Sequence, residues 1–268
     1  MSYLNANGIE IYYEDKGNVA RPAVVFSHGL LWSCRMFDEQ VDALQNDYRT
    51  IAYDHRGQGN SQPLTDAYDM ETVYADAVAL IETLGIAPCF FVGLSMGGFV
   101  GMRLAARRPD LVRGLVLLET SAEPEPTENI PRYRMLNNIV KYIGYWPVWN
   151  SVKKIMFGQK FLNDSTRREL LKACEKAFKS NHRKGITKAV EGVINRRGVL
   201  DELKNIKCPT LIIVGDQDVA TVPEKSKTIQ KNIACSKLVI IPGAGHSSSI
   251  EEPEAVTKAI IAFLKQYG

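Results

Sequence analysis

The sequence predicts an α/β fold built on a mostly parallel sheet, and three observations predict it. Seven short apolar runs are typical of buried strands, helical patterns separate several of them, and the composition is that of a globular chain. The 268 residues are 45% hydrophobic and 24% charged, with a formal net charge of +3. This composition excludes a disordered chain or a fibre, and the length allows one large domain or a domain with an insertion.

The predicted strands are short and rich in Val, Ile and Phe. Three runs are the most apolar, at 23–29, 89–95 and 211–216. Continuous apolar strands of this kind are required where both faces of a parallel sheet are covered. The first strands are separated only by short turns, which indicates an antiparallel start. The weaker runs lie at 11–14, 49–54, 114–120 and 237–243.

Helical patterns lie between these strands. Residues 70–84 place apolar side chains on one side of a helix, and Gly85 follows as a plausible C-terminal cap. Residues 99–107 and 253–264 show a similar helical pattern. Strands that alternate with helices predict βαβ units.

The alternation stops between Ser121 and Lys207. This stretch begins with a link rich in Pro and Glu and continues as helices without a strand-like run. We therefore predict a core domain from residues 1–120 and 208–268, and a helical cap from residues 121–207.

The charge of the chain is divided unevenly between the predicted cap and the rest. Residues 132–207 hold 18 Lys and Arg against 6 Asp and Glu, a net charge of +12, while the rest of the chain holds 15 against 24, a net charge of −9.

Composition also limits the location and the partners. The isoelectric point near 8.5 is too mild to indicate nucleic acid. No apolar stretch is long enough for a transmembrane helix, and the first residues lack the pattern of a signal peptide. Five cysteines, odd in number and widely spaced, indicate neither a disulfide framework nor a zinc site, so we expect a cytoplasmic protein.

The segment FFVGLSMGGF at 90–99 carries the clearest chemical signal. A predicted strand runs into the pattern G-x-S-x-G around Ser95, and a predicted helix follows. In this setting the glycines allow a tight turn that exposes the serine, and the helix N-terminus can stabilise a developing oxyanion. The alternatives are an incidental serine in a glycine-rich turn or a nucleotide-binding loop, but the sequence lacks the glycine patterns of such loops.

A serine nucleophile needs a base, and the chain has four histidines. His246 follows the predicted strand at 237–242, and strand ends are where such sheets present their chemistry. It is also the one histidine that follows the acid candidates, as the order Ser, Asp, His requires. We interpret His28 and His55 as structural loop residues and His182 as a surface residue.

Three carboxylates compete as the acid that orients the histidine. Asp216 and Asp218 both follow the strand at 211–215, and Glu119 ends the strand before it. Asp218 lies farther out along its loop, whereas Asp216 is better placed to bind backbone N–H groups of the turn. The order of the triad favours Asp218, with Asp216 and Glu119 as alternatives.

With these residues in place, the chain resembles the α/β-hydrolase family over nearly its whole length. The resemblance implies an eight-stranded, mostly parallel sheet with a cap inserted after the sixth strand. It carries Ser95 as nucleophile, Asp218 as acid and His246 as base, and it maps the oxyanion donors to the backbone N–H groups of Leu30 and Met96. Within the family, the chain looks most like 3-oxoadipate enol-lactonases and small cofactor-free carboxylesterases. The motifs are His28-Gly29-Leu30, D-x-R-G-x-G-x-S at 54–61, G-x-S-x-G-G at 93–98, G-D-x-D at 215–218 and G-x-G-H at 243–246.

A serine at the turn favours acyl chemistry over the relatives that carry aspartate there. We therefore expect a serine hydrolase that cleaves a carboxylic ester or lactone through an acyl-enzyme, without a metal or an organic cofactor. The alternatives are a carbon–carbon bond hydrolase of the same fold and a non-catalytic ligand receptor. Every position of the expected triad is filled, so nothing in the sequence indicates an inactive relative.

Residues for the substrate pocket are expected in two places. Leu31 and Trp32 follow the H-G turn, and Trp146 and Trp149 lie in a cap segment that interleaves aromatic residues with lysines. An apolar pocket with a basic rim would attract an anionic substrate, and a basic cap would also attract an anionic membrane surface. The alternative is ordinary helix packing, with aromatic side chains inward and lysines in water.

Overall fold

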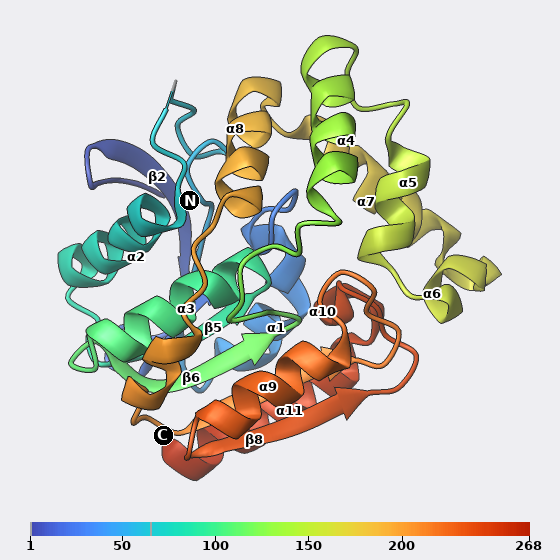
Figure 1. Cartoon of the computed structure of the whole chain (residues 1–268). Coiled ribbons are helices and arrows are strands. Elements are labelled where there is room, and N and C mark those ends of the chain that lie inside the picture. The colour runs from blue at the N-terminus through green and yellow to red at the C-terminus, as the bar shows by residue number, and fades with distance from the viewer. Residues whose placement is uncertain (1, 65) are drawn as a thin grey trace.

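The computed structural model describes residues 2–64 and 66–268 as a sheet covered by helices on both faces (Figure 1). The strands follow the order β1-β2-β4-β3-β5-β6-β7-β8. From β4 through β8 the neighbours pair in parallel, while β1 and β2 add an antiparallel edge. This confirms the predicted eight-stranded, mostly parallel sheet. The strands are β1 (Ser2–Ala6), β2 (Ile9–Lys16), β3 (Ala23–Ser27), β4 (Arg49–Tyr53), β5 (Cys89–Leu94), β6 (Val112–Leu118), β7 (Thr210–Gly215) and β8 (Ser236–Ile241).

Alternate side chains of the central strands build two separate apolar layers. Val92 of β5 belongs to the layer that includes side chains of helices α1 (Asp38–Leu44) and α11 (Pro253–Tyr267). Its neighbour Phe91 points to the other face, where it packs with α2 (Met70–Leu84), α3 (Met96–Arg107) and α9 (Pro223–Asn232). Successive side chains of a strand point to opposite faces, so a strand between two helical layers must be apolar throughout.

The helix α2 shows how the local sequence sets its ends. The Asp69 side chain accepts the N–H groups of Glu71 and Thr72, an N-terminal cap worth roughly 1 kcal/mol. The helix ends at Gly85 with a left-handed φ of 60°, the cap that the sequence predicts.

One strand was not predicted. The edge strand β1 is mostly exposed, so it lacks the apolar run that identifies the others. It pairs with β2 through a turn at Asn7 and Gly8, whose φ angles are 51° and 80°. An Asn-Gly pair is the strongest short-range sign of a β-hairpin, and this sign could have located the strand.

The residues between β6 and β7 form helices that stand above the sheet (Figure 1). We refer to residues 121–207 as the cap segment. Its last residues pack differently from the rest: Val199, Leu203 and Ile206 are buried in the same apolar layer as α3 and α9. The helices of the segment are α4 (Ile130–Tyr142), α5 (Trp149–Met156), α6 (Gln159–Asn163), α7 (Arg168–Ser180) and α8 (Arg183–Ile194).

Opposite charges join the cap segment to the rest of the chain. Lys160 and Arg167 lie 2.8 and 3.4 Å from the carboxylate of Glu252, which precedes α11. The short helix α10 (Ser248–Glu251) comes just before this residue. Within the described residues, no helix is both long enough and apolar enough to cross a membrane.

Candidate active site

Ser95 occupies the sharp turn between β5 and α3. Its φ of 51° and ψ of −106° lie in a rarely populated region, which costs on the order of 1–3 kcal/mol. A Cβ on Gly93 would stand 2.3 Å from the Gly97 oxygen, and a Cβ on Gly97 would stand 1.9 Å from the Ser27 oxygen. The turn therefore requires both glycines of the pattern that predicted it.

His246 lies on the loop between β8 and α10, beside Asp218 on the loop after β7. The imidazole Nδ1 is 3.1 and 3.0 Å from the two carboxylate oxygens of Asp218. This carboxylate also accepts the N–H groups of Ala220 and Thr221 and the hydroxyl of Thr221. Burial raises the pKa of Asp218, but His246 and the bonds from Thr221 outweigh burial and lower it below its ordinary value. An ionised Asp218 can orient the imidazole and stabilise its charged form.

Ser95 and His246 line the same pocket. No hydrogen bond joins the Ser95 hydroxyl to the imidazole in the part of the chain that the structure describes. Hydrogen bonds between catalytic groups are often loose until substrate is bound. The two side chains therefore share one site.

The other two acid candidates have different surroundings. Asp216 accepts the N–H of Gly243 at 2.7 Å. It thus binds a backbone N–H of the turn, the role that the sequence suggested for it in place of the catalytic one. Glu119 is fully buried and accepts the N–H of Gly215 at 3.2 Å. Burial and the nearby charge of Asp218 raise the pKa of Glu119 well above its ordinary value. A raised pKa disfavours the negative charge that a counter-ion to the imidazole needs, whereas the lowered pKa of Asp218 favours it.

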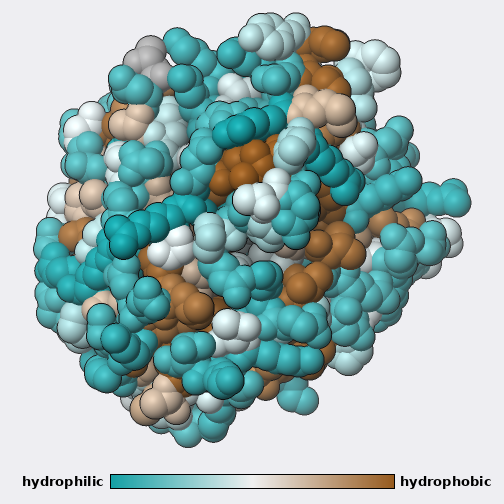
Figure 2. All heavy atoms as spheres, in the orientation of Figure 1, coloured by the Kyte–Doolittle hydropathy of each residue, from teal (hydrophilic) through white to brown (hydrophobic). Residues whose placement is uncertain are grey.

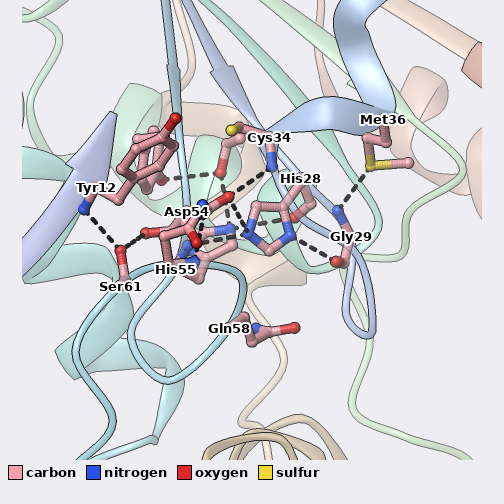
Figure 3. A network of polar contacts seen from close by, with 12 residues as sticks. Tyr12, His28, Gly29, Cys34, Met36, Asp54, His55, Gln58 and Ser61 are labelled. Atoms are coloured by element: carbon pink, nitrogen blue, oxygen red, sulfur yellow. Dashed lines mark hydrogen bonds and ion pairs between the residues drawn. The ribbon is translucent and has the colours of Figure 1, made fainter. Parts of the chain in front are cut away.

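The remaining histidines lie in other environments. His28 Nδ1 faces the Gly29 oxygen at 2.7 Å, and its Nε2 accepts the N–H of His55 at 3.0 Å (Figure 3). Burial lowers the pKa of both His28 and His55, which keeps these rings neutral. His182 caps the start of α8 by accepting the N–H of Gly185.

The network in Figure 3 fixes the loop that follows β3. Asp54 accepts the N–H of Cys34 at 2.7 Å and the N–H of Asn60 at 2.8 Å. A Cβ on Gly59 would lie 2.1 Å from the Asp54 carboxylate, so the D-x-R-G-x-G pattern needs this glycine to bring the two segments together.

Gln58 joins the two segments that hold the predicted oxyanion donors. Its Oε1 accepts the N–H of Leu31 at 3.0 Å, and its Nε2 lies 3.8 Å from the sulfur of Met96. Leu31 has a φ of 76°, a strained value for a leucine. The side chain of Gln58 therefore supports an unusual backbone conformation beside Leu30. Sequence reasoning did not identify this residue.

The pocket between the sheet and the cap segment has a volume of about 140 Å³. Ser95, His246 and Thr221 lie on the sheet side. The rest of the lining is mostly apolar and comes from Leu30, Leu31 and Phe99 and from helices α4, α5, α7 and α8. Among residues 2–64 and 66–268, no three His, Cys, Asp or Glu side chains gather as they would around a metal ion.

Three of the expected pocket residues lie elsewhere. Trp32 is buried against Phe157, and Trp149 is buried against Phe178. Trp146 is 74% exposed in the link between α4 and α5. None of the three tryptophans lines this pocket, whereas Leu31 does line it. The aromatic spacing could not tell which face of each cap helix turns inward.

The chain belongs to the α/β hydrolase fold family, whose model matches residues 22–253. Among known proteins it is similar to 3-oxoadipate enol-lactonase 2 from Acinetobacter baylyi, with 27% identity over 99% of this chain and 97% of the relative. The enol-lactonase from Burkholderia xenovorans has a similar structure, with a TM-score of 0.92, 29% identity, and 98% and 100% of the two chains covered. A thermophilic esterase from Thermogutta terrifontis gives a TM-score of 0.91 at 28% identity, with 99% and 98% covered. These similarities confirm the resemblance that the motifs predicted.

Proposed function

We propose that this protein is a serine hydrolase that cleaves a carboxylic ester or a lactone through an acyl-enzyme. The observation that carries the proposal is the imidazole of His246, held by an ionised Asp218 in a pocket that also contains the strained Ser95 turn. The similarity to an enol-lactonase and to an esterase supports the same type of bond.

The proposed mechanism uses each group once in each half of the reaction. His246 accepts the proton of the Ser95 hydroxyl while the serine oxygen attacks the carbonyl carbon, and the N–H groups of Leu30 and Met96 stabilise the oxyanion. His246 then gives its proton to the leaving alcohol oxygen. In a second half-reaction His246 takes a proton from water while the water oxygen attacks the acyl carbon. The bond from that carbon to the Ser95 oxygen then breaks, and His246 returns the proton to the Ser95 oxygen as the acid leaves.

The pocket indicates an apolar substrate body. Arg196 is the one Lys or Arg among the pocket-lining residues that the structure describes, and Glu125 lies 2.7 Å from its guanidinium. The basic residues of the cap thus do not converge on Ser95, and the cation that reaches the pocket is already paired. Attraction of an anionic substrate would have to come from this one side chain.

A matched pair of esters tests the anionic preference. We expect the neutral ester and its carboxylate-bearing analogue to have kcat/KM values within about threefold of each other, with little salt dependence, because Glu125 offsets the charge of Arg196. Glu125→Gln should raise the relative kcat/KM of the carboxylate ester about tenfold at low salt, because it removes the competing anion. A strong, salt-sensitive preference for the anionic ester in the wild-type enzyme would contradict this account and favour an anionic natural substrate.

Activity assays separate this proposal from its alternatives. A series of p-nitrophenyl esters and simple lactones should be hydrolysed, with a preference that follows the size of the acyl group. A carbon–carbon bond hydrolase would instead act on ring-cleavage diketones and hardly on esters. A receptor would bind such ligands without turnover.

The outer surface of the cap supports a second proposal, contact with an anionic membrane. Residues 130–163 contain six Lys and Arg and no Asp or Glu. Tyr142, Ile143 and Trp146 are 72%, 64% and 74% exposed there. Figure 2 shows hydrophobic atoms at the top of the molecule, over α4. Exposed aromatic residues beside cations are typical of membrane-interface surfaces.

Vesicle sedimentation tests this contact. We expect binding to vesicles that contain phosphatidylglycerol, weaker binding at high salt, and a clear loss with Trp146→Ser. Val219→Ser is the matched control, since Val219 is 63% exposed on the loop after β7. Equal sedimentation with neutral and anionic vesicles would exclude the proposal.

We also propose a cytoplasmic location, supported by the five cysteines, which are all free thiols.

A further inference from the structure

Glu251 is a fully buried carboxylate beside the candidate site. Its Oε2 accepts the N–H of Gly158 at 2.7 Å, and both of its oxygens accept the N–H of Gly245 at 3.0 Å. Its Oε1 also accepts the N–H of Ser247 at 3.1 Å. One side chain thus receives three backbone N–H groups, an arrangement suited to an ionised carboxylate.

These three N–H groups come from two separate parts of the chain. Gly245 and Ser247 are the neighbours of His246 on either side, while Gly158 lies in the cap segment between α5 and α6. The two backbones are in close contact, since a Cβ on Gly245 would stand 2.2 Å from the Gly158 nitrogen. Glu251 therefore links the loop that holds His246 to the cap segment, at a place where both segments are so close that each needs a glycine.

We propose that Glu251 is a positioning residue that fixes His246 toward the pocket and couples this position to the placement of the cap segment. This inference rests on the proposed role of His246 as the base. Among the described residues the carboxylate makes no hydrogen bond to the imidazole and does not line the pocket, so it acts through the backbone on both sides of His246. Loss of these bonds would let the imidazole shift, and displacements of about 1 Å in a catalytic group can lower turnover about 100-fold.

The charges around Glu251 make the tie sensitive to pH. Burial raises its pKa to about 7, against the lowering effect of the three N–H groups and of His246. Glu119 from the end of β6 and the Cys174 thiol of α7 also face it, and Arg167 donates to its backbone oxygen. Since the three N–H groups bind the ionised form best, the tie weakens as the pH falls through about 7.

Glu251→Gln tests the inference, because glutamine has the same shape but cannot accept all three N–H groups. Glu252→Gln is the matched control: Glu252 also joins the cap segment to the core, through Lys160 and Arg167, but it does not bind the histidine loop. Two measurements are needed, amide hydrogen exchange and steady-state kinetics with a small ester between pH 5.5 and pH 8.5, a window chosen to span about 1.5 units on each side of the Glu251 pKa.

In Glu251→Gln we expect exchange at Gly158, Gly245 and Ser247 to be at least about tenfold faster, with the amides of β5 unchanged. The kcat should fall about 10- to 100-fold with little change in KM, and the acid limb of the pH profile should become shallower because one titrating group is gone. Glu252→Gln should match the wild-type protein in all three respects.

Several results would overturn the inference. Wild-type kcat and wild-type exchange at Gly245 and Ser247 in Glu251→Gln would show that the carboxylate holds nothing in place. Faster exchange spread evenly over β5 and β7 would show a role in stability alone. The exchange experiment needs no substrate, so an enzyme inactive on every ester would refute the proposed function while exchange still decided the tie.

Discussion

Replacing Ser95 by alanine is expected to lower esterase turnover by about 10⁴-fold or more while the protein stays folded. The change removes the proposed nucleophile, and it removes no hydrogen bond of the turn, because the bond from the Ser95 N–H to the Leu118 oxygen belongs to the backbone. Alanine also has the same backbone preference as serine at a φ of 51°. Initial rates on a p-nitrophenyl ester and a thermal melt would measure the two effects.

Ser226→Ala is the matched control for this experiment. Ser226 is a fully buried serine on α9, and its hydroxyl has no partner in the part of the chain that the structure describes. Its removal should leave turnover at the wild-type level. Wild-type activity in Ser95→Ala would mean that the hydrolysis occurs through another group.

Asp218→Asn is expected to lower turnover by about 10⁴-fold with the fold intact. Asparagine would present an amide to His246 Nδ1 in place of a carboxylate, so the imidazole would lose its charge partner and its preferred tautomer. Activity measured across the pH range, together with a thermal melt, checks the effect.

Two matched variants give the contrast. Asp216→Asn keeps an oxygen for the Gly243 N–H and should act mainly on stability through that turn. Glu119→Gln should change little, because the raised pKa of Glu119 disfavours its charged form and glutamine keeps an oxygen for the Gly215 N–H. If Glu119→Gln were the crippling change and Asp218→Asn the mild one, the acid would have to be placed at the end of β6.

The sheet was predictable because its central strands are apolar on both faces. Residues such as Phe91 and Val92 serve opposite layers, which leaves a continuous apolar run in the sequence. The edge strand β1 carries no such signal, since a largely exposed strand needs few apolar side chains. The positions of the cap helices were not predictable, because helical periodicity does not say which partner each helix meets. Trp146 and Trp149 show this limit, one exposed and the other packed on Phe178.

Some residues of the candidate site could be predicted from the sequence and others could not. Ser95 and His246 stand out locally, because each follows a strand in a glycine-rich turn. The order of the triad favours Asp218 over Glu119 in the sequence, and distances and burial add support for this choice, since both residues follow strands at the same edge of the sheet. The hydrogen bond between Glu251 and Gly158 joins residues 93 positions apart, and no local sequence pattern predicts such a pair.

The most direct test of the acyl-enzyme mechanism is mass spectrometry of the protein after incubation with a fluorophosphonate ester. We expect a single adduct on the peptide that contains Ser95, slower labelling when a substrate ester is present, and no adduct in Ser95→Ala. An enzyme that hydrolyses esters but carries no label on Ser95, or carries the label on a different residue, would contradict the proposed function.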